Sequence, residues 1–171
     1  MKYFLKKKIY LIYLLVILIL AIQSVYLTQL LYKTWIDNSF SRLYLPPYQP
    51  INYFIQYSFF HFWSHFLAAL IFSLAILLLA KYFNKKSGEK YFWPEEIYFI
   101  VIAILIVGYP GWLVYFLLIL LTPLLFAISH LLLARKPERL SYYHLWLPLA
   151  ILAIIISRWL ATFSWWSKLI I

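Results

Sequence analysis

The sequence contains no cysteine, little charge and few acidic residues. Without cysteine, disulfides, zinc–thiolate sites and thiol nucleophiles are all excluded. Only 12% of the 171 residues are charged and five are acidic, so chemistry that needs carboxylates has few candidates. No internal repeat or low-complexity linker is present either. The chain therefore has the length and uniformity of one domain.

Apolar residues make up 66% of the chain, a figure that includes the 22% that are aromatic, and the mean hydropathy is +0.87. A soluble domain could not bury that much apolar surface, so we predict a single integral membrane domain over residues 1–171. The net charge of +10 comes from Lys and Arg at the ends of apolar runs. That placement is a topology signal. It favours the lipid bilayer as partner, with anionic lipid at the basic loops, and disfavours nucleic acid.

The apolar runs predict an all-α polytopic transmembrane helical bundle with five spans, six being the alternative. Residues 51–83 are too many for one upright span and too few for two full ones. An interfacial or re-entrant piece at Ile51–Phe60, joined to a span, would account for this length. The five predicted spans are Ile9–Tyr32, Trp63–Ala80, Pro94–Val107, Trp112–Leu133 and His144–Thr162.

Basic residues predict the orientation of these spans. Eleven of the 15 Lys and Arg residues lie in three segments: four before Ile9, four in residues 81–90 and three in residues 135–139. Five crossings place all three segments on the cytoplasmic side of the inner (plasma) membrane. Arg158 lies inside the last apolar run, where it is either a functional charge or, more often, an interfacial anchor beside Trp159.

Two glutamates, Glu95 and Glu96, follow Pro94 at the predicted start of a membrane helix. A carboxylate there is stabilised by the helix macrodipole, which alone could explain both residues. Catalysis would need a second carboxylate, and Asp37, 59 residues before Glu96, is the best candidate. Two facing carboxyl groups can share one proton, so that one acts as base for a water and the other as acid.

These residues resemble the type IV prepilin peptidases, membrane aspartyl proteases with a Gly-x-Gly-Asp signature. Asp37 with Leu45-Pro46 matches the first catalytic element, and Trp93-Pro94-Glu95-Glu96 falls in the signature slot. Gly108-Tyr109-Pro110 matches the turn after it. Leu140–His144 falls where the family has Ile-Pro-Phe-Gly-Pro. The resemblance implies cleavage of signal segments that are basic and then apolar, with transmembrane or signal segments of prepilin-like proteins as partners.

In that assignment Asp37 and Glu96 would exchange acid and base roles, with Glu95 as a charged neighbour. Both signature glycines are absent, replaced by Trp93 and Glu95, and glutamate stands for the second aspartate. The resemblance therefore implies a retained architecture with a lost or altered site. The alternatives are an active peptidase and a non-catalytic membrane scaffold or assembly factor.

A second motif is Phe60-His61-Phe62-Trp63-Ser64-His65. It resembles the second transmembrane helix of rhomboid serine proteases, which would make the chain a pseudoprotease that binds transmembrane segments. No Gly-x-Ser-Gly nucleophile is present, since Gly108–Gly111 has proline at the serine position. Two histidines at i, i+4 do not complete a metal site, so we predict no metal and no cofactor.

Overall fold

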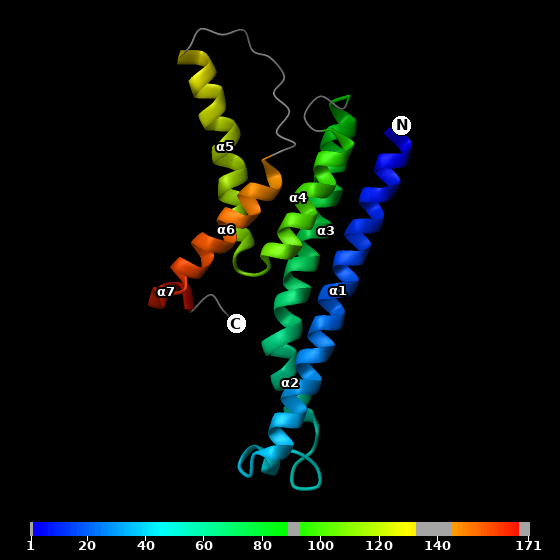
Figure 1. The fold of residues 1–171 in the computed structure, drawn as a ribbon, viewed down its shortest axis with the longest axis vertical. Helices are drawn as coiled ribbons and strands as arrows, with labels where there is room; N and C mark the ends of the chain where they lie inside the picture. The colour runs from blue at the N-terminus through cyan, green and yellow to red at the C-terminus, as the bar shows by residue number, and fades with distance from the viewer. Residues whose placement is uncertain (1, 89–92, 133–144, 168–171) are drawn as a thin grey trace.

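The computed structural model describes residues 2–88, 93–132 and 145–167, and these residues are helical with short connections (Figure 1). The predicted all-α class is confirmed for this part of the chain. The basic segment 135–139, Leu140–His144 and residues 89–92 lie outside it. The helices, in chain order, are α1 (Lys2–Asp37), the 3₁₀-helix η1 (Ser41–Tyr44), α2 (Asn52–Ser58), the π-helix η2 (Phe59–Trp63), α3 (Ser64–Lys86), α4 (Pro94–Val107), α5 (Trp112–Leu132), α6 (Trp146–Leu160) and α7 (Ser164–Ser167).

Two long helical rods run antiparallel along one side of the molecule (Figure 1). The first is α1, which has no proline or glycine and ends where the Asn38 side-chain oxygen accepts the N–H of Phe40 at 2.9 Å. The second runs without interruption from Asn52 to Lys86 through α2, η2 and α3. The predicted re-entrant break at Ile51–Phe60 is therefore wrong, because the helix continues through this region by way of one π-helical turn.

Helix α4 lies between these rods and α6, and most of its side chains are buried. It begins at Pro94, as predicted, because proline at the first helical position removes no hydrogen bond. It ends at Val107, and the next residue, Gly108, has a φ of 68° and a ψ of 177°, a combination that is essentially restricted to glycine. The turn Gly108–Gly111 follows, so that boundary was also predicted correctly.

The hydrophobic core consists of two clusters that meet along α4. One joins α4 to α1 and α3 through Tyr13, Ala69 and Val101. The other joins α4 to α5 and α6 through Ile104 and Trp146. Each half of the molecule therefore packs on a different face of the same short helix.

Two helical stretches, Lys8–Asp37 and Asn52–Lys86, are long and apolar enough to cross a membrane. Trp112–Phe126 and Trp146–Leu160 are shorter apolar helices. Large apolar side chains of both rods are exposed along their outer faces, as at Leu18 (60%) and Ile71 (67%). Such surfaces suit a lipid environment better than water.

Candidate functional site

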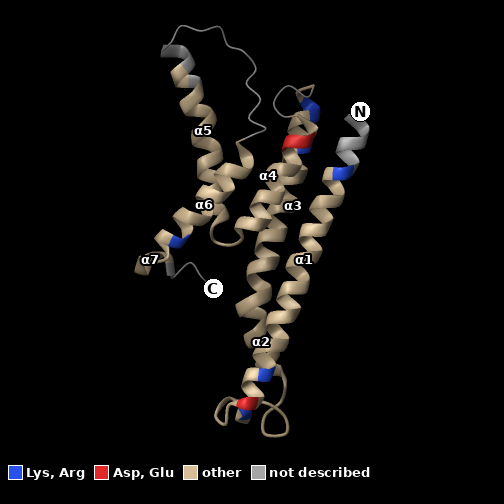
Figure 2. Ribbon diagram, viewed as in Figure 1, with Lys and Arg blue, Asp and Glu red and all other residues tan. Residues whose placement is uncertain are grey.

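The structure does not bring Asp37 and Glu96 together. Tyr13 of α1 contacts Tyr98, two residues after Glu96, with ring centroids 6.5 Å apart. Asp37 lies 24 residues beyond Tyr13, or about 36 Å further along the same helix. Figure 2 accordingly shows acidic residues at opposite ends of the long rods.

The second rod leads to the same conclusion. Trp35, near the end of α1, packs on Phe54 with ring centroids 5.3 Å apart. At the other end, the Lys81 ammonium lies 4.9 Å from the Tyr98 ring. Phe54 and Lys81 are 27 residues apart on one continuous helix, or about 40 Å. Two carboxyl groups can share a proton only when they lie a few ångströms apart. Asp37 and Glu96 therefore form no catalytic pair in this structure.

Glu96 instead has a structural role at the start of α4. Its side chain is 3% exposed, and Oε2 accepts the backbone N–H of Trp93 at 3.0 Å. This is the reciprocal half of a capping box, which satisfies an amide that the helix leaves unpaired. Glu95 is half-buried in the same first turn. The macrodipole explanation therefore accounts for both residues without catalysis.

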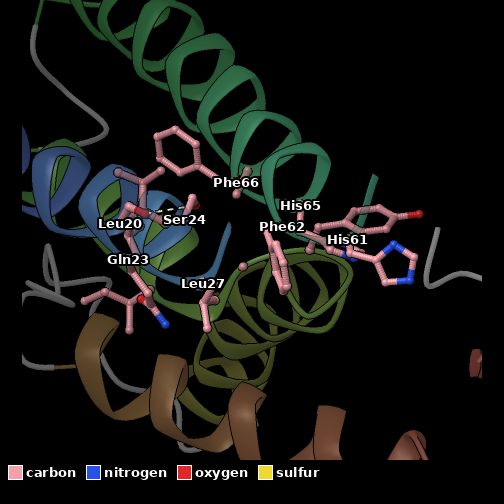
Figure 3. A pocket seen from close by; sticks show the side chains of 13 residues that line it. Leu20, Gln23, Ser24, Leu27, His61, Phe62, His65 and Phe66 are labelled. Carbon is pink, nitrogen blue, oxygen red and sulfur yellow. Dashed lines mark hydrogen bonds between the residues drawn. The ribbon is translucent and has the colours of Figure 1, made fainter. Parts of the chain in front are cut away.

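A cavity of about 330 Å³, with some polar side chains on mostly apolar walls, lies instead where the π-helix faces α1 and the α4–α5 turn. Helix α1 contributes Gln23 and Ser24, and the second rod contributes His61 and His65. Tyr109 of the turn closes a third side. Figure 3 shows Leu20, Gln23, Ser24 and Leu27 of α1 with Phe62, His65 and Phe66 around this space. The volume is that of a small ligand or of a few side chains.

The π-helical turn is held by side-chain hydrogen bonds to its own carbonyls and to α1. The Ser64 hydroxyl donates to the Phe60 carbonyl, and His61 Nδ1 lies 2.9 Å from the Tyr57 carbonyl. Because a carbonyl can only accept, Nδ1 carries the proton there. Trp63 Nε1 donates across to Thr28 Oγ1 of α1 at 3.2 Å. Single π-turns of this kind are frequent at functional sites.

His65 supplies the least satisfied polar atom of the cavity. Its ring stacks on Tyr109 with centroids 5.8 Å apart and an interplanar angle of 24°. Its Nδ1 is buried and has no hydrogen-bond partner among the described residues. Buried polar atoms without partners are uncommon because they lose hydration without compensation. The imidazole ring of His65 lines the cavity, but its Nδ1 is covered by the protein and does not face the open space.

The serine hydroxyl of the cavity is bonded to its own helix. Ser24 is buried and its hydroxyl donates to the Leu20 carbonyl at 3.0 Å. Among the described residues no hydrogen bond joins Ser24 to His61 or His65, so neither histidine activates this serine here. The described residues also contain no group of three side chains that could hold a metal ion.

Sequence analysis singled out His61 and His65 but missed Tyr109 as a wall of the cavity. Gln23, Ser24 and Thr28 break the apolar run of α1, and that polarity was the available signal for packing against protein. Nothing in the sequence distinguishes Tyr109 from other interfacial tyrosines. No protein-family model, curated protein or solved structure matches the chain.

Proposed function

We propose that the chain is a five-span protein of the inner (plasma) membrane that binds a transmembrane or signal segment of another protein without cleaving it. It would act as a scaffold or assembly factor. The observation that carries the proposal is a cavity between apolar helices that has Gln23, His61 and His65 on otherwise mostly apolar walls.

The distribution of charge supports the membrane orientation. Lys8 of α1 and three lysines at the end of α3, Lys81, Lys85 and Lys86, lie at one end of the rods (Figure 2). By the positive-inside rule this end faces the cytoplasm, which puts the N-terminus there too. The described spans would be α1, the Asn52–Lys86 rod, α4, α5 and α6.

The depth of the cavity supports a membrane-embedded ligand. Ser24, on its wall, lies 16 residues from Lys8, or about 24 Å along α1. The hydrocarbon core is about 30 Å thick, so the cavity would open within the bilayer towards its outer side. Polar groups at that depth recognise partners by interhelical hydrogen bonds.

Photo-crosslinking tests the binding. A photoreactive phenylalanine analogue replaces Phe62, which lines the cavity, or Ile71, which is 67% exposed on α3. The probe is a segment with basic residues followed by about 20 apolar ones, the length of one span. We expect crosslinking at position 62 well above that at position 71. Equal crosslinking at the two positions would mean that the cavity is not the binding site.

A pair of substitutions then tests the polar contact. His65→Leu should weaken crosslinking at position 62, because it removes a polar imidazole ring from the cavity wall. Gln29→Leu removes an exposed polar side chain of α1 outside the cavity and should leave it unchanged. Equal effects of the two substitutions would contradict recognition through His65.

The same segment discriminates binding from peptidase activity. Wild type and Glu96→Gln are each incubated in membranes with the segment, and the products are sized. We expect the segment to stay intact with both. Cleavage by the wild type that is lost in Glu96→Gln would overturn the non-catalytic proposal and restore Glu96 as a catalytic group.

A further inference from the structure

Arg158 is the only charged residue in the described parts of α5, α6 and α7 (Figure 2). It lies in the last turn of α6, a helix that is otherwise almost entirely apolar. The described acidic residues, Asp37, Glu95 and Glu96, are on other helices, and none forms an ion pair with it. A cation in an apolar helix of a membrane protein needs a counter-charge or water.

A cavity of about 460 Å³ lies directly beside this side chain. Its walls come from three places: the Tyr109–Gly111 part of the α4–α5 turn, Ser157 and Arg158 of α6, and Trp166 of α7. Tyr109 also lines the histidine cavity, so the turn separates the two spaces. The larger cavity has no acidic side chain on its walls. Its one charge is therefore positive, and no acidic side chain of the described residues lines the cavity to neutralise it.

The surrounding side chains are typical of the level of lipid headgroups. Trp159 packs on Phe163 with ring centroids 5.2 Å apart, and Trp165 packs on Trp166 at 5.6 Å. Trp159 and Trp165 remain 62% and 54% exposed. Tryptophan gathers at membrane interfaces because its ring is apolar while its N–H needs a polar partner. This end of α6 would therefore lie where phospholipid phosphates lie.

We propose that this second cavity binds the phosphate group of a membrane phospholipid, with Arg158 as its counter-charge. A guanidinium presents several N–H donors in a plane and can bind two phosphate oxygens at once. The apolar walls formed by Ile106, Val107 and Ile154 would hold the start of an acyl chain. This site is separate from the histidine cavity and does not depend on its function.

Native mass spectrometry of the full chain in detergent tests the proposal by counting retained lipid. Phosphatidylglycerol and phosphatidylcholine both carry the phosphodiester and should be retained, whereas diacylglycerol lacks it and should not. Arg158→Gln should reduce retention by roughly tenfold, the range of one charge-assisted hydrogen-bonded pair. Arg158→Lys should reduce it less. Lys33→Gln, which removes an exposed charge far along α1, should have no effect.

A second variant separates the cavity from the charge. Ala161 lines the cavity, and Ala161→Trp would fill it without touching the Arg158 charge. We expect loss of bound lipid here too. Full retention in Ala161→Trp or in Arg158→Gln would overturn the site, as would equal retention of diacylglycerol. If an excess of inorganic phosphate displaced the lipid and itself bound in an Arg158-dependent manner, free phosphate would be the ligand and the lipid proposal would fail.

Discussion

Helices α1 and α4 are both apolar but differ in how many of their apolar side chains are buried against the rest of the protein. In α4 nearly every position from Glu96 to Leu105 is buried. In α1 the buried residues are few, Ile9, Tyr13 and Ser24 among them, and many of the residues between them are exposed and just as apolar. Apolarity therefore identifies the protein-facing side of α4 but not that of α1.

Small and weakly polar residues are part of the packed faces of α3 and α6. On α3 the buried positions are Ala69, Ser73, Leu77 and Asn84. On α6 the buried positions are Trp146, Ala150 and Ala153. In a bilayer the exposed face is also apolar, so close approach of backbones and interhelical hydrogen bonds select the interface. The rods and the α4 core should therefore respond to different substitutions.

The largest expected effect is in the α4 core. Ile104 is 0% exposed and Ile106, on the same helix, is 49% exposed. Ile104→Ala should lower the free energy of unfolding by about 2–5 kcal/mol, because the cavity it leaves cannot collapse fully. Ile106→Ala and Leu18→Ala on the α1 surface should each change it by about 0.5 kcal/mol or less. Unfolding in mixed detergent micelles measures all three, and similar losses would remove the contrast between α4 and α1.

The turn after α4 comes next, because its two glycines are needed for different reasons. A Cβ at Gly111 would lie 2.9 Å from Val107 Cγ1 and 3.0 Å from Ser157 Oγ. A Cβ at Gly108 would meet no atom within 4 Å, but the backbone angles there are ones that essentially only glycine adopts. Each alanine substitution should cost about 1–3 kcal/mol of unfolding free energy, by crowding at 111 and by strain at 108.

Adding Ser157→Ala distinguishes these two causes. It removes one of the atoms that a Cβ at Gly111 would meet, so it should recover part of the Gly111→Ala loss. It should recover nothing for Gly108→Ala. Equal behaviour of the two double variants would show that α6 does not pack closely on the turn.

The contact between the rods should be weaker. Tyr13 and Ser73 share a buried hydrogen bond of 2.9 Å between α1 and α3. Ser73→Ala should lower the free energy of unfolding by up to about 1.7 kcal/mol, since it leaves the buried Tyr13 hydroxyl unpaired. Tyr13→Phe should lower it by about 0.6 kcal/mol, since the Ser73 hydroxyl that remains can bond its own helix backbone. Tyr10→Phe, on an exposed ring, is the control. Thermal unfolding of the three variants measures these losses. A larger loss in Tyr13→Phe than in Ser73→Ala would contradict the prediction.

The sequence predicts much of this architecture and little of the site. Proline and glycine fix the start of α4 and the turn after it, because each restricts or permits particular backbone angles. The continuous helix at Asn52–Lys86 was missed because a π-turn has no sequence signature and the length exceeds that of an ordinary span.

The acidic pair shows two sequence arguments in conflict. The family resemblance needs Asp37 and Glu96 together, whereas the five-span prediction puts one span, Trp63–Ala80, between them and so places them on opposite sides. An even number of membrane crossings would return the chain to the same side of the membrane. A single continuous helix crosses once and leaves the two residues on opposite sides. The structure has that single helix between them, so the two carboxylates lie at opposite ends.

The smallest expected effect is at Glu96, and it decides between a cap and a catalytic acid. Glu96→Ala should cost about 0.3–1.5 kcal/mol of unfolding free energy, because the Trp93 N–H loses its acceptor. Glu96→Gln keeps an acceptor oxygen and should lose less. Glu95→Ala, one position away and half-buried, should change stability less than Glu96→Ala. If Glu96→Gln instead raised stability, the buried carboxylate would be strained, as expected of a functional acid, and the helix cap would not explain it.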